Sequence, residues 1–422
     1  MTEEVAYPKY RWLILVMGWV ILSLTSYNNT MQNVRYDLLL PVVDGGLGLT
    51  TSQFYLCITA SSVAPIALAL VSGLLTDRIG VKRVILYGAI LTTVGALLRL
   101  AATGFTDLFI YCVLMGVGLG TVGGNVPKLV GQWFHVRQIY LGIALFTTAL
   151  GIGPVLALAT GAMWPSYFTG FLVMGLSLGA MCVVWAIWAK DRPKEYLEDG
   201  RAIVGVSFKE GLLTVIKSKY LWLIIGAYAL AQGVISGYVG GMALVLVEDK
   251  GVSEGLAGVV VALGALGYVI GIVLWSWVAE KAGYMKPVFC VCAVLAGIGG
   301  FLTYLSAPGT GMWAIALLPG LFNGAVTPLI FQMPLRLKGI GTRYAGSAMG
   351  LIASFGHVMS FVMLPFLFTP MWQTVGAFWA VLVFFVILAA IAAALFSLLP
   401  EVGRRYMEKA LKEAVEAQGP AS

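Results

Sequence analysis

The sequence predicts an all-α integral membrane protein with twelve transmembrane helices in two pseudo-symmetric six-helix halves. Three observations support this fold class: the composition, twelve long apolar segments, and the placement of basic residues between them. Of the 422 residues, 60% are hydrophobic and 11% are charged, whereas soluble domains carry roughly 25% charged residues. The composition alone therefore favours the membrane class over a soluble one.

Twelve segments are long and apolar enough to cross a bilayer, which takes about 20 residues. The expected spans are 12–43, 53–75, 84–103, 107–133, 138–163, 167–189, 220–247, 255–279, 287–306, 311–333, 343–368 and 372–399. Most connections are short, but 190–219 is polar and basic. We therefore expect a six-helix half at 1–189, a cytoplasmic linker at 190–219, a second half at 220–399 and a cytoplasmic tail at 400–422.

Lysine and arginine gather on one side of these spans, as the positive-inside rule requires. If the N-terminus is cytoplasmic, 22 basic residues lie in the inner connections and the tail, and Lys250 alone lies outside. Both termini are therefore expected in the cytoplasm, in a multi-pass protein of the cell membrane. The net charge of +7 arises from these connections and forms no basic domain, which argues against nucleic acid as a partner.

Three basic residues fall within spans. Lys128 lies toward the inner end of the fourth span, yet well before the loop that holds Arg137. Arg99 is expected to snorkel to the outer membrane surface. Arg35 is expected to attract an anion at the outer mouth, and on a helix its side chain would diverge from that of Asp37, two residues later.

The segment after the second span recurs in the second half. Residues 73–83 read Gly-Leu-Leu-Thr-Asp-Arg-Ile-Gly-Val-Lys-Arg, and residues 276–286 read Ser-Trp-Val-Ala-Glu-Lys-Ala-Gly-Tyr-Met-Lys. The offset of 203 pairs Asp77 with Glu280. A repeat at the same place in each half predicts two parallel six-helix units, with a solute path at their interface near the bilayer midplane.

This motif, Gly-x-x-x-Asp-Arg-x-Gly-x-Lys-Arg, resembles the signature loop between the second and third helices of the major facilitator superfamily. The resemblance implies that superfamily's fold, in which spans 1, 4, 7 and 10 line a central cavity, and alternating access to its two sides. Glycine permits close backbone approach, and an acid can face a helix N-terminus. The expected conformational latch consists of Gly73, Asp77, Arg78, Gly80 and Arg83; for Lys82, a simple inner anchor is an equal alternative.

The first span is interrupted by thirteen mostly polar residues, from Thr25 to Asp37. Polar groups that face lipid are costly, so this segment must face protein or water. At about 100° per residue, two neighbouring stripes form, which are expected to line a cavity: Thr25, Asn29, Gln32 and Tyr36 on one, and Ser26, Thr30, Asn33 and Asp37 on the other. Helix-to-helix hydrogen bonding is the alternative for some of them.

Three further spans carry polar faces at helical spacing, and the resemblance places all three at the centre. These faces are Thr121, Asn125, Lys128 and Gln132 in the fourth span, Tyr228, Gln232 and Ser236 in the seventh, and Asn323 and Thr327 in the tenth. An ammonium inside a membrane is a functional hypothesis by default, with snorkelling as its alternative. The expected substrate contacts are Asn29, Gln32, Asn33, Arg35, Tyr36, Thr121, Asn125, Lys128, Tyr228, Gln232, Asn323 and Thr327.

The expected cargo is a small inorganic or organic anion. Lys128 and Arg35 outweigh Asp37 along the path, and a positive cavity of low dielectric favours anions. The stretch 125–134 resembles the fourth helix of cyanate-type and nitrate-type porters of the superfamily, but this chain lacks the arginines that nitrate porters place in their second and eighth helices. Asp37 and His357 are the candidates for carrying a coupling proton.

Two alternative functions stay open. A multidrug exporter of the same fold could use Tyr27, Tyr36 and Tyr228 as an aromatic wall, and a receptor or assembly protein would share the same spans without moving a solute. An enzyme is not expected, because no catalytic set gathers at one membrane depth and no Gly-x-x-x-x-Gly-Lys-Ser/Thr loop is present. We expect no cofactor and no metal, and a monomer in the bilayer.

Overall fold

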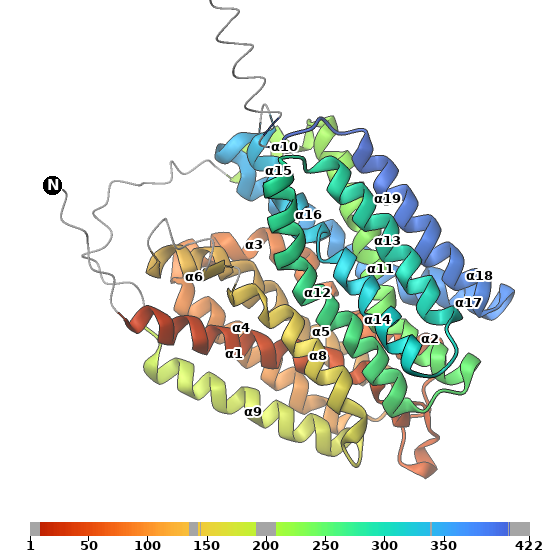
Figure 1. Ribbon diagram of the computed structural model, residues 1–422. Coiled ribbons are helices and arrows are strands. Elements are labelled where there is room, and N and C mark those ends of the chain that lie inside the picture. Colours follow the sequence, from red (N-terminus) through yellow and green to blue (C-terminus); the bar gives the residue numbers. More distant parts are fainter. Residues whose placement is uncertain are drawn as a thin grey trace, which may run out of the picture.

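The computed structural model describes residues 9–134, 142–143, 145–190, 208–337, 340–403 and 405, and helices make up nearly all of this part (Figure 1). Twelve helical segments within these described ranges are long and apolar enough to cross a membrane, which confirms the predicted all-α class and the predicted number of spans. More than half of the predicted linker 190–219 and most of the predicted tail 400–422 lie outside the described residues.

The helices of the first half pack closely because small residues let their backbones approach. They are α1 (Tyr10–Thr30), α2 (Thr51–Ala60), α3 (Val63–Ile79), α4 (Val81–Leu98), α5 (Phe105–Val122), α6 (Val126–Trp133), α8 (Ala149–Thr160) and α9 (Tyr167–Trp188). Between α4 and α5, a Cβ on Gly95 would stand 2.8 Å from the carbonyl oxygen of Tyr111. Close backbone approach through glycine is the usual means of helix association in lipid.

The second half repeats this packing. Its helices are α11 (Lys219–Lys250), α12 (Glu254–Ala282), α13 (Lys286–Leu305), α14 (Thr310–Asn323), α15 (Val326–Arg336), α16 (Gly341–Val362), α17 (Thr369–Val375), α18 (Ala377–Val381) and α19 (Leu388–Ser397), preceded by the short α10 (Phe208–Ile216). Two π-helical stretches, Met363–Phe368 and Leu382–Ile387, continue the last two spans. α12 and α14 meet at Gly267, where a Cβ would stand 2.2 Å from the Leu317 carbonyl oxygen.

Prolines divide two central spans at matching places. Pro127 offers no amide hydrogen to the carbonyl of Gly123, and Pro328 offers none to the carbonyl of Gly324. α5 and α14 end there, and the helices resume within a few residues as α6 and α15. Interrupted helices at corresponding positions of two repeats mark the region where membrane transporters hold their solutes.

The first span ends earlier than the sequence predicts. α1 stops at Thr30, a 3₁₀ turn covers Met31–Val34, and Arg35 has φ −102° and ψ 72°. Short 3₁₀ turns follow in the rest of the predicted span 12–43. The spacing of 100° per residue therefore does not hold beyond Thr30, and Tyr36 does not continue the stripe that begins on α1.

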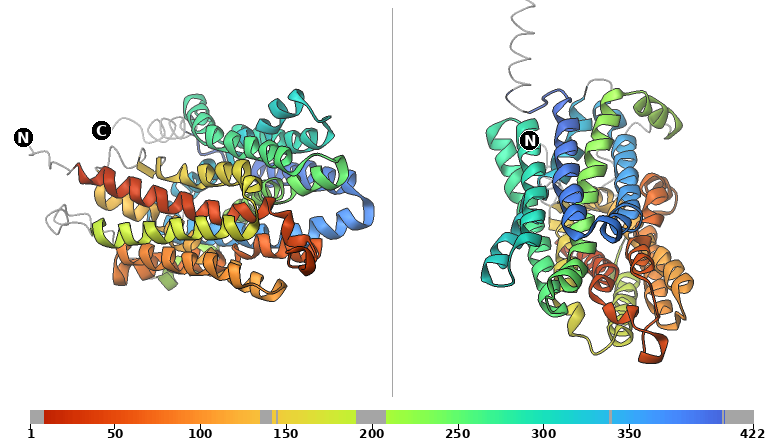
Figure 2. Two further views of the ribbon diagram at one scale, coloured as in Figure 1. Left: turned by 90° about the horizontal axis from the view of Figure 1, so that it is seen from below. Right: turned by 90° about the vertical axis from the view of Figure 1, so that its right-hand side faces the viewer.

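Three clusters of buried hydrophobic residues show where the halves join. One cluster contains residues of both halves. It lies at the end of the molecule opposite the N-terminus and includes Leu38, Leu246 and Phe384. The other two clusters lie one in each half, at the end that carries the N-terminus. Contacts of α8 with α12 and of α3 with α16 also cross the interface. The two helix bundles are inclined to each other (Figures 1 and 2), and they share a hydrophobic core at one end.

Candidate substrate site

A pocket of about 140 Å³ lies between the two halves, next to the shared hydrophobic cluster. It is lined by α1 and the turn after it, by α2 and the turn after it, and by α5 and α11. The lining residues are Asn29, Thr30, Asn33, Ile58, Thr59, Ser61, Ser62, Leu119, Ser236, Val239 and Gly240. Every one of these side chains is neutral, so the pocket offers amides and hydroxyls for hydrogen bonding rather than an opposite charge.

The turn between α2 and α3 brings serine hydroxyls to this pocket. Pro65 offers no amide hydrogen to the carbonyl of Ser61, and the helix is interrupted at Ser61 and Ser62. Gly116 of α5 lies opposite, where a Cβ would stand 2.0 Å from the Ser61 carbonyl oxygen. Sequence reasoning missed this segment, although the run Thr-Ala-Ser-Ser at 59–62, with a proline three residues after it, was a signal for it.

Asn29 and Asn33 are the predicted contacts that reach the pocket. The amide nitrogen of Asn29 donates to the carbonyl of Thr25 at 2.8 Å, and that of Asn33 donates to the carbonyl of Val239 in α11 at 3.0 Å. The Oδ1 atoms of both asparagines are buried without a hydrogen-bond partner. In each side-chain amide the nitrogen therefore donates a hydrogen bond, and the oxygen can still accept one.

Gln32 and Tyr36 are buried but do not line the pocket. The Oε1 atom of Gln32 accepts from the thiol of Cys112 in α5 at 3.1 Å. The ring of Tyr36 packs at 6.0 Å from that of Phe54 in α2. Both side chains contact neighbouring helices of the first half. For these two residues the structure agrees with the alternative interpretation, in which part of the polar segment bonds to other helices.

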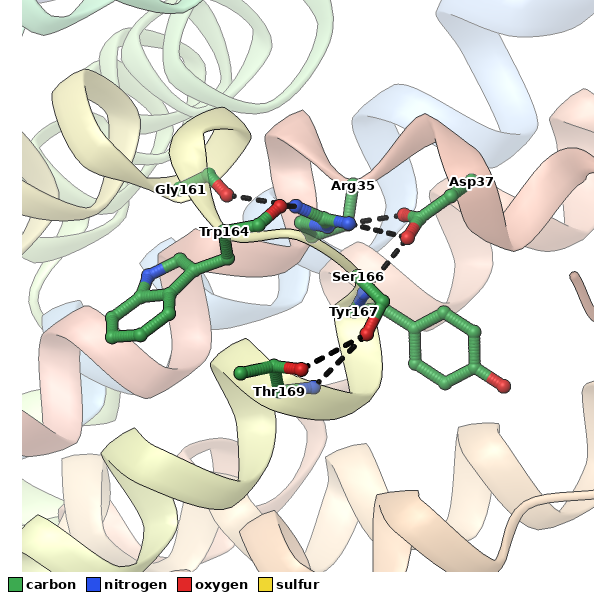
Figure 3. Close-up of polar contacts among 7 residues, drawn as sticks. All are labelled: Arg35, Asp37, Gly161, Trp164, Ser166, Tyr167 and Thr169. Atoms are coloured by element: carbon green, nitrogen blue, oxygen red, sulfur yellow. Dashed lines mark hydrogen bonds and ion pairs between the residues drawn. The ribbon is translucent and has the colours of Figure 1, made fainter. Parts of the chain in front are cut away.

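The prediction that Arg35 and Asp37 diverge is wrong, because the chain is not α-helical there. Arg35 Nε donates to Asp37 Oδ1 at 3.0 Å, and Nη2 forms an ion pair with Asp37 Oδ2 (Figure 3). Arg35 Nη1 donates to the carbonyls of Gly161 and Trp164 at 3.0 and 2.8 Å, and the backbone amide of Tyr167 donates to Asp37 Oδ2 at 2.7 Å. We call these five residues the outer staple.

Within the outer staple, every nitrogen of the Arg35 guanidinium group donates a hydrogen bond. Arg35 is 5% exposed, and each of its three nitrogens donates a hydrogen bond within the first half. The staple therefore ties the end of the first span to the turn before α9. These contacts give Arg35 a structural role, and its predicted role in attracting an anion loses its main support.

The polar face predicted on the fourth span is divided among different neighbours. Thr121 lies against α4, where a Cβ on Gly88 would stand 1.8 Å from its hydroxyl oxygen. Asn125 is fully buried and accepts a hydrogen bond from the hydroxyl of Thr76 in α3. Lys128 lies partly buried on α6. The structure thus brings none of these three residues to the pocket lining.

The predicted contacts of the second half gather along α11, α14 and α15. Tyr228 is 6% exposed and lies within the hydrophobic cluster of that half. Thr327 shares a hydrogen bond with the hydroxyl of Tyr268 at 3.0 Å. Gln232 Oε1 and Asn323 Oδ1 are buried without a hydrogen-bond partner, so this half also holds unused acceptors.

Buried polar atoms without a hydrogen-bond partner are concentrated in the polar segment of the first span. About 90% or more of buried polar groups in proteins are paired, and the hydrocarbon core of a bilayer supplies no water for the others. Seven residues between positions 23 and 36 carry such an atom: Ser23, Thr25, Ser26, Asn29, Gln32, Asn33 and Tyr36. This concentration is what a solute path along the first span would require.

The signature loop has a glycine with positive φ at the same place in both halves, although ψ is 154° at Gly80 and 13° at Gly283. Gly80, between α3 and α4, has φ +87°, and Gly283, between α12 and α13, has φ +74°, a region that side chains disfavour. Arg78 and Arg83 are exposed beside Gly80. The side chain of Asp77 and the surroundings of Gly73 lie outside the described part, and the latch role of this loop stays a prediction.

Arg99 does not snorkel to the surface as expected. It is 1% exposed, its guanidinium carbon lies 3.8 Å from the ring centre of Phe171, and Nη1 donates to the carbonyl of Asn28 at 3.1 Å. His357 lies partly buried on α16. Its proton-carrying role stays a prediction, as does that of Asp37 in the outer staple.

Known sequences resemble this chain over most of its length. The sequence profile of the Major Facilitator Superfamily matches residues 18–364. The Hexuronate transporter of Bacillus subtilis (strain 168) is 23% identical over 383 residues, which are 85% of this chain and 89% of that protein. The Chloramphenicol resistance protein of Pseudomonas aeruginosa is 26% identical over 404 residues, which are 89% of this chain and 84% of that protein.

A solved structure resembles the fold. It is a crystal structure of a bacterial homologue of the human lysosomal transporter Spinster, in an inward-facing and unoccupied conformation. The match has a TM-score of 0.71 at 14% identity and covers 93% of this chain and 97% of the other. At this identity the similarity concerns the fold, and it confirms the twelve-helix architecture that the sequence predicts.

Proposed function

The chain belongs to the major facilitator superfamily of membrane transporters, and from this premise we propose that it carries a small organic acid, as an anion, by secondary transport. The observation that supports the proposal most is the pocket between the halves, together with the unpartnered polar atoms along the first span. A hydroxylated solute would satisfy the amide oxygens of Asn29 and Asn33, which line the pocket, and alternating exposure of the interface would release it on the other side.

Lys128 supports the anionic part of the proposal. It lies partly buried on α6, just after the proline-induced break of a central span. An ammonium at such a place attracts anions in a low-dielectric cavity. The similar protein of B. subtilis is named for hexuronate, a solute with both a carboxylate and hydroxyl groups, and the residues here suit the same pairing of chemistries.

The direction in which the interface opens follows from the charge distribution. The inner connections and the tail hold 22 basic residues and the outer connections hold one, which favours both termini in the cytoplasm. In that orientation the shared hydrophobic cluster lies at the outer end. We infer that the structure is an inward-facing state, in which the outer end is closed and a solute reaches the pocket from the cytoplasm.

The alternative of a multidrug exporter is favoured by the similarity to the chloramphenicol resistance protein. Its expected aromatic wall is not present in this state. The hydroxyl of Tyr27 bonds to Thr160 and to the indole of Trp164, and Tyr27, Tyr36 and Tyr228 are each 6% exposed. A neutral polar pocket suits a hydroxylated acid better than an apolar drug.

Flux measurements in proteoliposomes test the proposal. We expect counterflow of at least one acid from a panel of glucuronate, galacturonate, gluconate and benzoate, and no uptake of the cationic dye ethidium. Lys128→Ala should lower acid uptake by roughly 10-fold or more, the effect of losing a hydrogen bond to a charged group. Lys217→Ala, which removes an exposed lysine before α11, should leave uptake unchanged.

Three results would contradict the proposal. Ethidium uptake without acid uptake would favour the exporter. Acid uptake that is equal in Lys128→Ala and in the parent would remove the role of Lys128. A folded protein that moves neither acids nor dye would favour a receptor or assembly protein.

A further inference from the structure

Among the described residues, two hydrogen bonds join the halves at their shared end, and both reach the backbone of α11. The amide nitrogen of Asn33 donates to the carbonyl of Val239 at 3.0 Å, and the hydroxyl of Tyr55 donates to the carbonyl of Gly241 at 3.3 Å. Hydrophobic packing surrounds them. These donors come from the first half and the acceptors from the second, so the two bonds break when the outer end opens.

The orientation of the Asn33 amide is fixed by this contact. A backbone carbonyl can only accept, so the nitrogen must face Val239 and the oxygen must face elsewhere. Asn33 is 5% exposed, its Oδ1 atom has no hydrogen-bond partner, and the residue lines the pocket. The same amide therefore belongs to the outer closure through its nitrogen and offers an unused acceptor at the pocket.

The rest of the pocket is also rich in acceptors. Asn29 has its nitrogen on the carbonyl of Thr25 and its oxygen unpartnered. The hydroxyl of Thr59 already donates to the carbonyl of Tyr55 at 3.0 Å, which leaves its lone pairs for a donor. Amide oxygens repel a carboxylate and accept from hydroxyl groups, so this pocket suits the hydroxylated part of a solute rather than its anionic part.

We propose that Asn33 acts in both places at once: its nitrogen holds the outer end closed, and its oxygen accepts a hydrogen bond from a hydroxyl group of the bound solute. A donor on the amide oxygen polarises the amide and strengthens the bond that its nitrogen donates. A hydroxylated solute thus favours the outer-closed state, and by linkage the closed state binds that solute more tightly. The choice of ligand rests on the proposed transport function, whereas the closure is a property of the protein alone.

A cysteine reporter at the closed interface measures the closure without any ligand. Val34 is 1% exposed and faces Gly258 of α12 across the interface. Val34→Cys is labelled in intact cells with a membrane-impermeant maleimide, and the parent with its native cysteines gives the background. We expect Tyr55→Phe, Asn33→Ala and Asn33→Asp each to raise the labelling rate roughly 2- to 10-fold, the effect of losing one hydrogen bond. Thr374→Ala, which removes an exposed hydroxyl that bonds to carbonyls within α17, should leave the rate unchanged.

The role of the Asn33 oxygen in solute binding is tested by asking whether glucuronate, galacturonate or gluconate protects the same cysteine from labelling. Hexanoate, a carboxylate without hydroxyl groups, is the control. At least one hydroxy acid should slow labelling of the Val34→Cys protein, and hexanoate should not. Protection should persist in Tyr55→Phe, which keeps the amide of Asn33. It should be lost in Asn33→Ala and in Asn33→Asp, because the second variant lacks the amide nitrogen and places a negative charge beside an anionic solute. Tyr55→Phe is conservative enough to keep the fold, so the closure can be tested even if Asn33→Ala misfolds.

Several outcomes would overturn the inference. Unchanged labelling in both Tyr55→Phe and Asn33→Asp would remove the closure, even if acid uptake is intact. Protection that survives in Asn33→Ala, or that no hydroxy acid gives, would remove the acceptor role. Protection by sodium chloride but not by choline chloride would assign the amide oxygens to a cation. Faster labelling in the closure variants without any acid uptake would support the closure and refute the transport proposal instead.

Discussion

Replacement of Asp37 by asparagine should loosen the outer staple without altering the pocket. The carboxylate accepts two hydrogen bonds from Arg35 and one from the backbone amide of Tyr167. Removing one partner of a buried ion pair costs about 3–5 kcal/mol. The side chain of Asp37 is 24% exposed, against 6% for Arg35, so water replaces part of the lost interaction. We therefore expect a loss of about 2–3 kcal/mol.

Thermal unfolding of the purified protein measures this loss. The five cysteines are free and four of them are buried, so a thiol-reactive fluorogenic dye reports their exposure. One kcal/mol shifts the melting temperature by about 2–4 °C in a protein of 150–250 residues and by less in a longer chain. Asp37→Asn should thus melt roughly 3–6 °C below the parent. Asp44→Asn, which changes an exposed acid in the same outer segment, should melt with the parent, and equal melting of the two variants would refute the structural role of the staple.

The same variant separates the staple from proton coupling. If Asp37 carries the coupling proton, Asp37→Asn should abolish uptake driven by a proton gradient while counterflow persists. If Asp37 only holds Arg35, both activities of the folded variant should stay near the parent's at a temperature below its melting point.

Further variants address packing and the latch. Arg99→Lys should lower the melting temperature more than Arg99→Leu, because lysine keeps a buried charge but lacks the planar fork of donors; a snorkelling arginine would tolerate lysine better. Gly267→Ala should destabilise the protein by about 1–3 kcal/mol, since the new Cβ meets the backbone of α14, whereas Gly255→Ala, with open space around it, should be neutral or slightly stabilising by melting temperature. Arg78→Gln with Arg83→Gln should slow transport in the proteoliposome assay without changing the melting temperature if these exposed cations form the latch.

The sequence was sufficient for the fold because composition and span length depend on local properties. Twelve apolar segments and a repeated loop are visible along the chain, and the described part of the structure has twelve such spans and a glycine with positive φ at both Gly80 and Gly283. The polar run in the first span could likewise be recognised as unsuited to lipid. Asn29 and Asn33 in that run do reach the pocket.

The details of the site were not predictable, because they depend on partners far away in the chain. Two acceptors of Arg35 are the backbone carbonyls of Gly161 and Trp164, 126 and 129 positions away. Carbonyls are the same in every residue type, so no sequence pattern marks them. The stripe that linked Asn29 to Tyr36 also assumed an α-helix, whereas 3₁₀ turns follow Thr30.

A polar face on a helix does not say what it faces. Thr121 and Asn125 share a predicted stripe with Lys128, yet Thr121 lies against Gly88 of α4 and Asn125 bonds to Thr76 of α3. Glycine and threonine on those neighbours provide the space and the donor that accommodate them. Which neighbour lies opposite is decided by the packing of whole helices, and single-helix periodicity contains no information about it.

The outer staple changes which solutes suit the path. Arg35 is hydrogen-bonded to Asp37 and to two carbonyls. Of the two basic residues that the sequence assigned to the path, Lys128 therefore remains as the candidate for attracting an anion. The pocket lined by Asn29 and Asn33 presents oxygen acceptors, which repel a bare anion such as nitrate. A solute that uses both regions must combine a carboxylate with hydroxyl groups. The proposed substrate class therefore narrows from any small anion to hydroxylated organic acids, and the lack of nitrate-porter arginines in the second and eighth spans agrees with that narrowing.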